Sequence, residues 1–269
     1  MGDVNFSCTM CGKCCRDHNL PLCIDEAIAW IEDGGEVCVL CEAADWSTEP
    51  DAQDRRAAYT KGRSFAATCG GSPIRVTVVL IGMVSGNCRN LGDDLRCRIY
   101  ERRPRVCRIY PAEINPFMVF DARAKSCPPE AWRAAASPSS AGDITDGETR
   151  ALVEAFRRAD REDAPRKRHL CRLLEIDVAA PTGEGFVIHR PESSRLLAAL
   201  QESRHAQASP PADSGWRIYS TESATVSSLQ SRGLEATRHQ RKGETFWYVS
   251  TAAMRPAASA PQVEEKPHA

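Results

Sequence analysis

The chain has 269 residues, a net charge of −1 and a hydrophobic content of 42%, values ordinary for a globular protein with one sizeable domain or two small ones. Because the charges nearly balance, the composition gives no support to nucleic acid as a partner. The longest apolar run, residues 76–84, is far shorter than the roughly 20 residues that cross a bilayer, so no membrane span is predicted.

Cysteine is the outlier in this composition, with thirteen residues. The sequence before the first cysteine lacks the basic and apolar stretches of a signal peptide, so we expect the protein to be cytoplasmic. In a reducing cytoplasm, clustered cysteines are more typical of metal sites than of disulfides. The cysteine pattern is therefore the first guide to function.

Four thiols lie within eight consecutive residues near the start of the chain, at Cys8, Cys11, Cys14 and Cys15. Overlapping C-x-x-C units let a tight turn direct several sulfurs at one ion or cluster, and Gly12 can take the positive φ that such a turn requires. Thiolates this close repel one another unless a cation lies between them. Because neighbouring side chains such as Cys14 and Cys15 diverge, we expect further ligands from elsewhere in the chain.

Residues 25–33 predict a short helix that begins with acidic residues and ends at a glycine pair. A further C-x-x-C follows at Cys38 and Cys41, and with Cys69 and Cys23 it could form an additional metal site. The alternative, which we favour, is that these thiols are buried as small hydrophobic side chains.

The best strand signal is residues 74–81, which are rich in β-branched side chains. They follow a polar stretch, residues 42–63, in which residues 51–59 predict a short helix. We expect residues 117–121 to form the companion strand. The two strands would flank the second group of cysteines and hold their loops at fixed separations.

That second group consists of Cys88, Cys97, Cys107 and Cys127. Pro104 and Pro111 predict a short helix around Cys107, since proline can open a helix and cannot continue one. Tyr100, Glu101 and Tyr110 are expected to orient this segment by hydrogen bonds. His18, near the first group, is expected to face solvent, and no nucleophile with a base and an orienting group can be identified.

Basic residues alternate with the cysteines of both groups, at Lys13, Arg16, Arg89, Arg96, Arg98, Arg102, Arg103, Arg105 and Arg108. A four-thiolate zinc site or an oxidised four-iron cluster carries a charge of about −2, which a cationic shell would offset. The alternative, a nucleic-acid-binding face, is weaker because aromatic residues do not alternate with these charges.

The two cysteine motifs read F-x-C-x-x-C-G-x-C-C and C-x-I-Y-E-x-R-P-x-x-C-R-x-Y-P, with single cysteines at Cys88 and Cys127. This pattern resembles the YkgJ-like CxxCxxCC family of candidate zinc- or iron-chelating proteins, over roughly residues 6–128. The resemblance implies a cysteine-ligated metal or iron–sulfur centre, and assigns the metal ligands to Cys8, Cys11, Cys14, Cys15, Cys88, Cys97, Cys107 and Cys127. A similar pattern occurs in flagellin lysine methylases, which are linked to an iron–sulfur cluster.

The fold class that we predict is α+β, with an irregular cysteine-cluster domain of a few strands and short helices over residues 1–133. A linker over residues 134–147 leads to a small α/β C-terminal region, residues 148–250, and to a disordered tail, residues 251–269.

Within the C-terminal region, helices are expected over residues 148–161, 165–175, 191–203 and 223–231. Strands are expected over residues 185–189 and 216–219, and a hairpin is expected from residues 234–240 and 244–250. This region contains no catalytic motif, and a protein partner would bind there.

The sequence favours a metal-binding protein that holds an iron–sulfur cluster, or alternatively Zn²⁺, with a redox, metal-handling or modification role. Two other functions stay open. One is an S-adenosylmethionine-linked protein-modifying enzyme resembling the flagellin lysine methylases, and the other is a structural zinc protein that binds a partner. The absence of a Rossmann or phosphate-binding glycine motif counts against the enzyme without deciding the matter.

Overall fold

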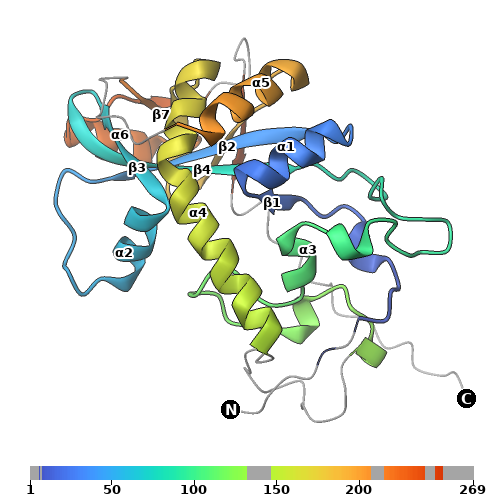
Figure 1. The fold of residues 1–269 in the computed structure, drawn as a ribbon. Helices are drawn as coiled ribbons and strands as arrows, with labels where there is room; N and C mark the ends of the chain where they lie inside the picture. The colour runs from blue at the N-terminus through green and yellow to red at the C-terminus, as the bar shows by residue number, and fades with distance from the viewer. Residues whose placement is uncertain (1–5, 7, 132–146, 207–214, 240–245, 251–269) are drawn as a thin grey trace, which may run out of the picture.

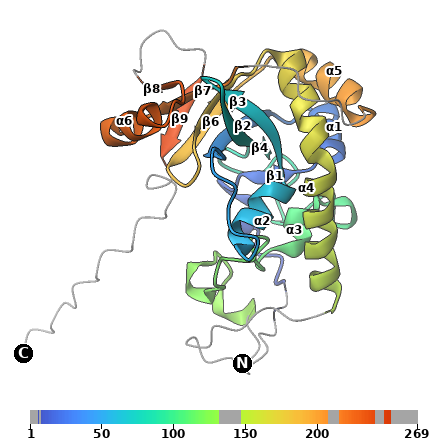
Figure 2. The same cartoon turned by 90° about the vertical axis from the view of Figure 1, so that its left-hand side faces the viewer.

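The computed structural model describes residues 6, 8–131, 147–206, 215–239 and 246–250. Its mixture of helices with a mixed sheet confirms the predicted α+β class (Figures 1 and 2). Most of the predicted linker and all of the predicted tail lie outside the described residues, and the division into domains stays a prediction. Among the described helices, none is long and apolar enough to cross a membrane.

The helices and strands have the following bounds. The α-helices are α1 Ile24–Glu32, α2 Arg55–Gly62, α3 Arg105–Ile109, α4 Gly147–Leu174, α5 Ser193–Arg204 and α6 Ser223–Ser231. The strands are β1 Leu20–Leu22, β2 Val37–Asp45, β3 Ser64–Cys69, β4 Ser72–Gly82, β5 Val178–Pro181, β6 Gly185–His189, β7 Arg217–Ser220, β8 Ala236–Arg238 and β9 Trp247–Ser250.

The sheet is built around the antiparallel pair β2 and β4, which runs from Val37 opposite Gly82 to Asp45 opposite Ile74. Because β2 occupies one edge of β4 along its whole length, β1 and β3 pair with the other edge, one at each end. The free edge of β2 pairs with β6 and then with β5, which continues to β7 and β8. Strands from both halves of the sequence therefore share one sheet.

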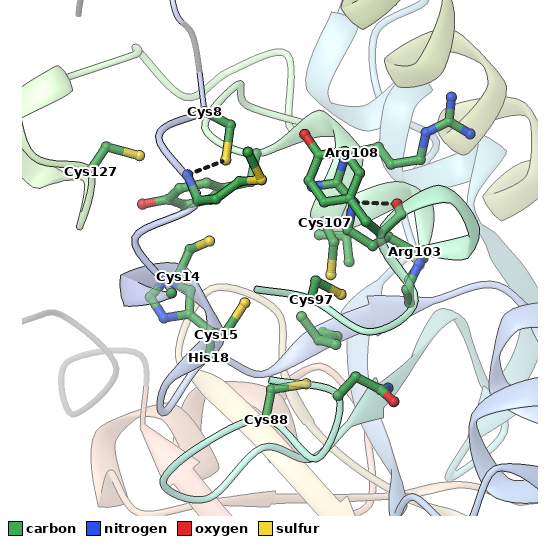
Figure 3. Close-up of a pocket in the computed structure, with 18 of the residues that line it drawn as sticks. Cys8, Cys14, Cys15, His18, Cys88, Cys97, Arg103, Cys107, Arg108 and Cys127 are labelled. Atoms are coloured by element: carbon green, nitrogen blue, oxygen red, sulfur yellow. Dashed lines mark hydrogen bonds between the residues drawn. The ribbon is translucent and has the colours of Figure 1, made fainter. Parts of the chain in front are cut away.

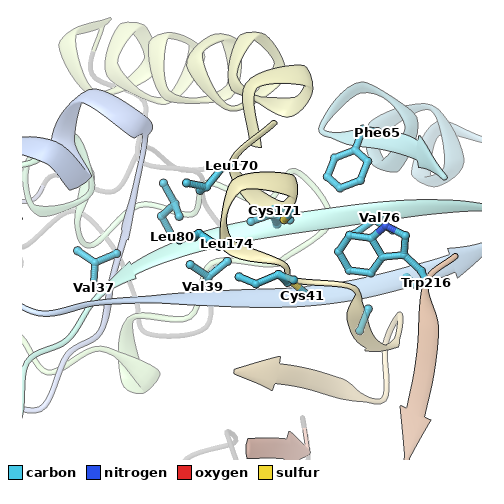
Figure 4. Close-up of a cluster of buried hydrophobic side chains, with 14 of the residues drawn as sticks. Val37, Val39, Cys41, Phe65, Val76, Leu80, Leu170, Cys171, Leu174 and Trp216 are labelled. Atoms are coloured by element: carbon cyan, nitrogen blue, oxygen red, sulfur yellow. The ribbon is translucent and has the colours of Figure 1, made fainter. Parts of the chain in front are cut away.

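Helices α1, α4 and α5 cover one face of this sheet (Figure 2). Their apolar side chains meet those of β2 and β4 in the main core, where Val39 and Leu80 from the sheet lie near Leu170 and Leu174 from α4 (Figure 4). The predicted helix over residues 25–33 is confirmed as α1, which buries Ala27, Trp30 and Ile31.

Helix α4 corrects the prediction of two helices separated near residues 162–164. It runs through Pro165 without interruption. A proline inside a helix costs about 3 kcal/mol, because one hydrogen bond is lost. Side chains on both sides of it, including Phe156 and Leu170, are buried, and each contributes about 1.5–3 kcal/mol. Burial of the whole apolar face therefore keeps the helix continuous.

Two predicted strand pairings are wrong. Residues 117–121 are not a strand and cannot pair with β4, because both edges of β4 are already occupied; instead the Phe117 amide bonds the Asn115 side chain in a turn. The predicted terminal hairpin does not form either. Strand β8 pairs with β7 in parallel, whereas β9 pairs with β6.

A buried ionic group ties α4 to the end of α2. Asp160 accepts hydrogen bonds from Arg63 at 2.8 Å and from Lys167 at 2.7 Å, and Lys167 is only 2% exposed. Burial alone would raise the pKa of Asp160, but the two cations outweigh it and hold the pKa below its ordinary value. The single carboxylate therefore compensates one buried and one half-buried positive charge.

We expect Asp160→Asn to lower the free energy of unfolding by about 3–5 kcal/mol at pH 7, because it leaves both cations unpaired. A group with a lowered pKa stabilises the fold above its unfolded pKa of about 3.9 and loses that contribution as pH falls further. The difference in free energy of unfolding between wild type and variant should therefore become smaller below about pH 4. Urea unfolding measures it. The matched control is Glu154→Gln, at an exposed carboxylate of the same helix, and equal stability of the two variants would contradict the expectation.

Candidate metal centre

The pairing of β1 with β4 brings the two cysteine groups together. Leu20 lies opposite Gly82, so the segment before β1 runs beside the segment after β4. The ladder continues outside the strands as a bridge between Arg16 and Asn87, and the Cys88 amide donates to the Cys15 carbonyl at 2.7 Å. Residues more than seventy positions apart in the sequence are thus adjacent in space.

The first group lies on a tight turn, as expected. Gly12 has a φ of 69°, in the left-handed region that favours glycine, and the following residues Lys13–Cys15 form one turn of 3-10 helix. A side chain at Gly12 would meet Leu91 at 3.1 Å, so the turn packs directly on the loop that carries the second group.

Cys88 and Cys97 lie on one loop closed by its own backbone. Leu91 forms a bridge with Cys97, and the Arg98 amide donates to the carbonyl of the buried Asn90 at 2.8 Å. These bonds hold Cys88 and Cys97 beside each other although they are separated by eight residues.

Cys107 lies on α3, which begins after Pro104, as predicted. The helix is docked onto α1, because the Arg105 amide donates to the Glu26 carboxylate at 2.8 Å.

The segment that carries Cys127 is held by an aromatic side chain. The Ser126 amide donates to the Tyr110 hydroxyl at 2.8 Å, which agrees with the expected orienting role of Tyr110. Upstream, Phe120 packs against Phe6, so this segment also contacts the start of the chain. The first cysteine group, the segment from Cys88 to Cys107 and the segment that carries Cys127 are thereby held close to one another.

All eight predicted ligands line a single cavity of about 290 Å³: Cys8, Cys11, Cys14, Cys15, Cys88, Cys97, Cys107 and Cys127 (Figure 3). Cys8 is exposed and the other seven are half-buried. Among the described residues, no three Cys, His, Asp or Glu side chains meet in a geometry that could hold an ion. The thiols surround the cavity, and their assignment as ligands stays a prediction.

His18 also lines the cavity and is half-buried, so it lies at the site and keeps contact with solvent. Its ring packs edge-on against Tyr110, with the centroids 5.7 Å apart, and Nδ1 lies 3.0 Å from the Arg16 carbonyl. One feature of the sequence indicates that His18 could line the site, namely its position three residues after Cys15.

The thiols influence one another strongly. The hydrogen bond from Cys15 lowers the pKa of Cys14, and the same bond raises the pKa of Cys15 well above its ordinary value. Burial, followed by the nearby thiols of Cys15 and Cys88, raises the pKa of Cys107 to about 12. Burial likewise raises the pKa values of Cys88 and Cys127. A bound cation would relieve this repulsion, so the donor set fits a thiolate-ligated metal.

The basic shell forms only in part. Arg103 and Arg108 line the cavity. Arg103 is held in place, because its Nε donates to the Tyr100 carbonyl at 2.7 Å and its guanidinium lies 3.7 Å from the Tyr100 ring centroid. Arg105 and Arg89 instead face Glu26 and Asp33, away from the cavity.

The additional metal site is not formed. Cys38 and Cys41 are three residues apart on β2, so their side chains lie on opposite faces of the sheet and enter different clusters. Cys41 meets Cys171 in the main core (Figure 4). Cys69 bonds the Glu235 carbonyl, and Cys23 lies 3.1 Å from the Arg105 guanidinium. The favoured alternative, buried thiols, is confirmed.

The fold and the cavity define a cysteine-rich protein in which eight thiols line one space. Comparison with family models then shows that residues 7–128, just under half of the chain, match CxxCxxCC, described as a "putative zinc- or iron-chelating domain". Residues 7–128 therefore match the model of this family, as the motifs predicted, and the match supports a metal-binding role. The narrower name YkgJ is not part of the match. Comparisons with curated proteins and with solved structures gave no match.

We expect Cys107→Ser to bind less metal per chain than wild type and to have a lower Tm, since metal binding and folding are coupled in such sites. Cys38→Ala, on the far side of the sheet, is the control and should keep the wild-type metal content. Elemental analysis of the purified proteins and thermal unfolding provide the two readouts. Full metal content in Cys107→Ser would remove Cys107 from the ligand set.

Proposed function

We propose that the protein holds an iron–sulfur centre through Cys8, Cys11, Cys14, Cys15, Cys88, Cys97, Cys107 and Cys127, and that it has a redox role. The observation that carries the proposal is that eight thiols from three parts of the chain line one cavity. Zinc is the alternative occupant, because zinc and iron–sulfur clusters both take four thiolates in similar geometry.

One feature favours the cluster over zinc. The spacing of Cys8, Cys11 and Cys14, with a distant Cys127 followed by Pro128, corresponds to that of bacterial ferredoxins, where a remote Cys-Pro completes the C-x-x-C-x-x-C set.

Exposure of the site supports a redox role. A centre near the surface can exchange electrons with a partner, and its potential responds to nearby charge and to solvent. Arg103 and Arg108 at the cavity would stabilise the more negative, reduced state. When bound, the cluster supplies the electron chemistry, and the residues of the chain hold it, shield it and set the charge around it.

We expect protein purified without oxygen to be brown, with broad visible absorption, iron and acid-labile sulfide. Admission of air should bleach the colour, because exposed clusters are open to oxidants. The Cys38→Ala variant should be as brown as wild type. If protein prepared in the same way from iron-supplemented cells is colourless and contains stoichiometric zinc, the iron–sulfur proposal is wrong and zinc occupies the site.

A further inference from the structure

Helix α2 lies beside the middle of α4 (Figures 1 and 2), and a cavity of about 160 Å³ lies between the two helices. No described cysteine lines this cavity, so it is separate from the candidate metal centre. An apolar cavity of about 150 Å³ can hold one benzene molecule. The space between α2 and α4 is therefore large enough for a ligand of that size.

Part of the cavity lining is apolar. Phe156 of α4 is only 7% exposed, and Ile114 packs against the same buried cluster. Tyr59 of α2 also lines the cavity, and its ring packs edge-on against Phe117 with the centroids 5.7 Å apart. These side chains offer a ligand a hydrophobic surface that is already fixed in place.

The polar lining has more hydrogen-bond donors than acceptors. Asp160 is the one carboxylate among the described lining residues, and its two oxygens already accept from Lys167 and from Nε of Arg63. The charge of Glu42 also acts on Arg63, but Glu42 does not line the cavity. Within the described part of the chain, the terminal nitrogens of Arg63 and the hydroxyl of Tyr59 have no hydrogen-bond acceptor.

Three guanidinium groups and a single carboxylate line the cavity, so its lining is positively charged. The Arg157 guanidinium is engaged, because it donates to the Ile114 carbonyl at 2.8 Å and to Glu154 at 3.0 Å. Arg161 is exposed and has no ion pair with any described residue. Its stem lies over Gly62, where a Cβ would come within 3.3 Å of the Arg161 Cδ. Arg161 is therefore the positive charge that a ligand can reach.

We propose that this cavity binds a small carboxylate whose apolar part is about the size of one aromatic ring. The carboxylate accepts hydrogen bonds from Arg161, from the terminal nitrogens of Arg63 and from the Tyr59 hydroxyl. The ring packs on Phe156 and Ile114. Hydrogen bonds between guanidinium and carboxylate groups are stronger than those between neutral groups. The proposal does not depend on the metal centre, so either can fail without the other.

The test is calorimetric titration of the full chain with benzoate, with benzamide and with inorganic phosphate. Wild type should bind benzoate at least about tenfold more tightly than benzamide, which has the same size and no charge. Arg161→Gln should weaken benzoate binding about tenfold, while Arg158→Gln, at an exposed arginine of the same helix, should bind as wild type does. Saturating benzoate should also raise the Tm of wild type more than that of Arg161→Gln, which shows in addition that the variant folds.

Three results would overturn the proposal. If benzoate does not bind at millimolar concentration, or if benzamide binds as tightly, the guanidinium groups do not select a carboxylate here. If Arg161→Gln binds benzoate as tightly as wild type does, the ligand lies elsewhere on the protein. If phosphate binds as tightly as benzoate, the cavity recognises charge alone and the assignment to an aromatic carboxylate is wrong.

Discussion

The antiparallel pairing of β1 with β4 is the constraint on which the site depends. Only three residue pairs form it, but they join the two cysteine-bearing segments at a fixed register. A slip by one residue would place the side chains of β1 on the wrong face of the sheet, since they alternate with a period of two. Leu20 and Leu22 are buried while Pro21 between them is not, so the hydrophobic core specifies the register.

The sheet therefore holds in place the segments around the cavity, which contain little helix or strand themselves. Around the cavity the chain forms single turns of helix, one five-residue helix and loops tied by isolated hydrogen bonds. Loops of this kind can place thiols from distant segments at one point, which a straight helix or strand cannot do. The cost is repulsion among the thiolates, which a bound cation and the guanidinium of Arg103 offset.

Much of this arrangement could be predicted from the residues. The choice of eight cysteines among thirteen came from two spaced motifs, two single cysteines and the family that this pattern resembles. All eight line the cavity, although their role as ligands is still a prediction. Helix α1 and strand β4 have strong local signals. Strands β1, β2, β3 and β5 were missed. Strand β1 has only three residues, β2 and β5 pair with distant segments, and β3 forms a hairpin with β4 through Gly70 and Gly71, a local signal that was overlooked. Residues 117–121 have strand-like side chains but no free edge to join.

Helix α4 has a consequence for where this protein can be divided. Its first turns, at Glu148, Thr149 and Leu152, line the cavity, while Leu170 and Leu174 near its other end fill the core beneath the sheet. At about 1.5 Å per residue it spans on the order of 40 Å. A fragment ending at residue 128, where the family match stops, would thus lack the α4 residues that line the cavity. It would also expose the apolar face of β2 and β4 to solvent. The cysteine-bearing segment therefore packs against residues that lie beyond the part of the chain that matches the family model.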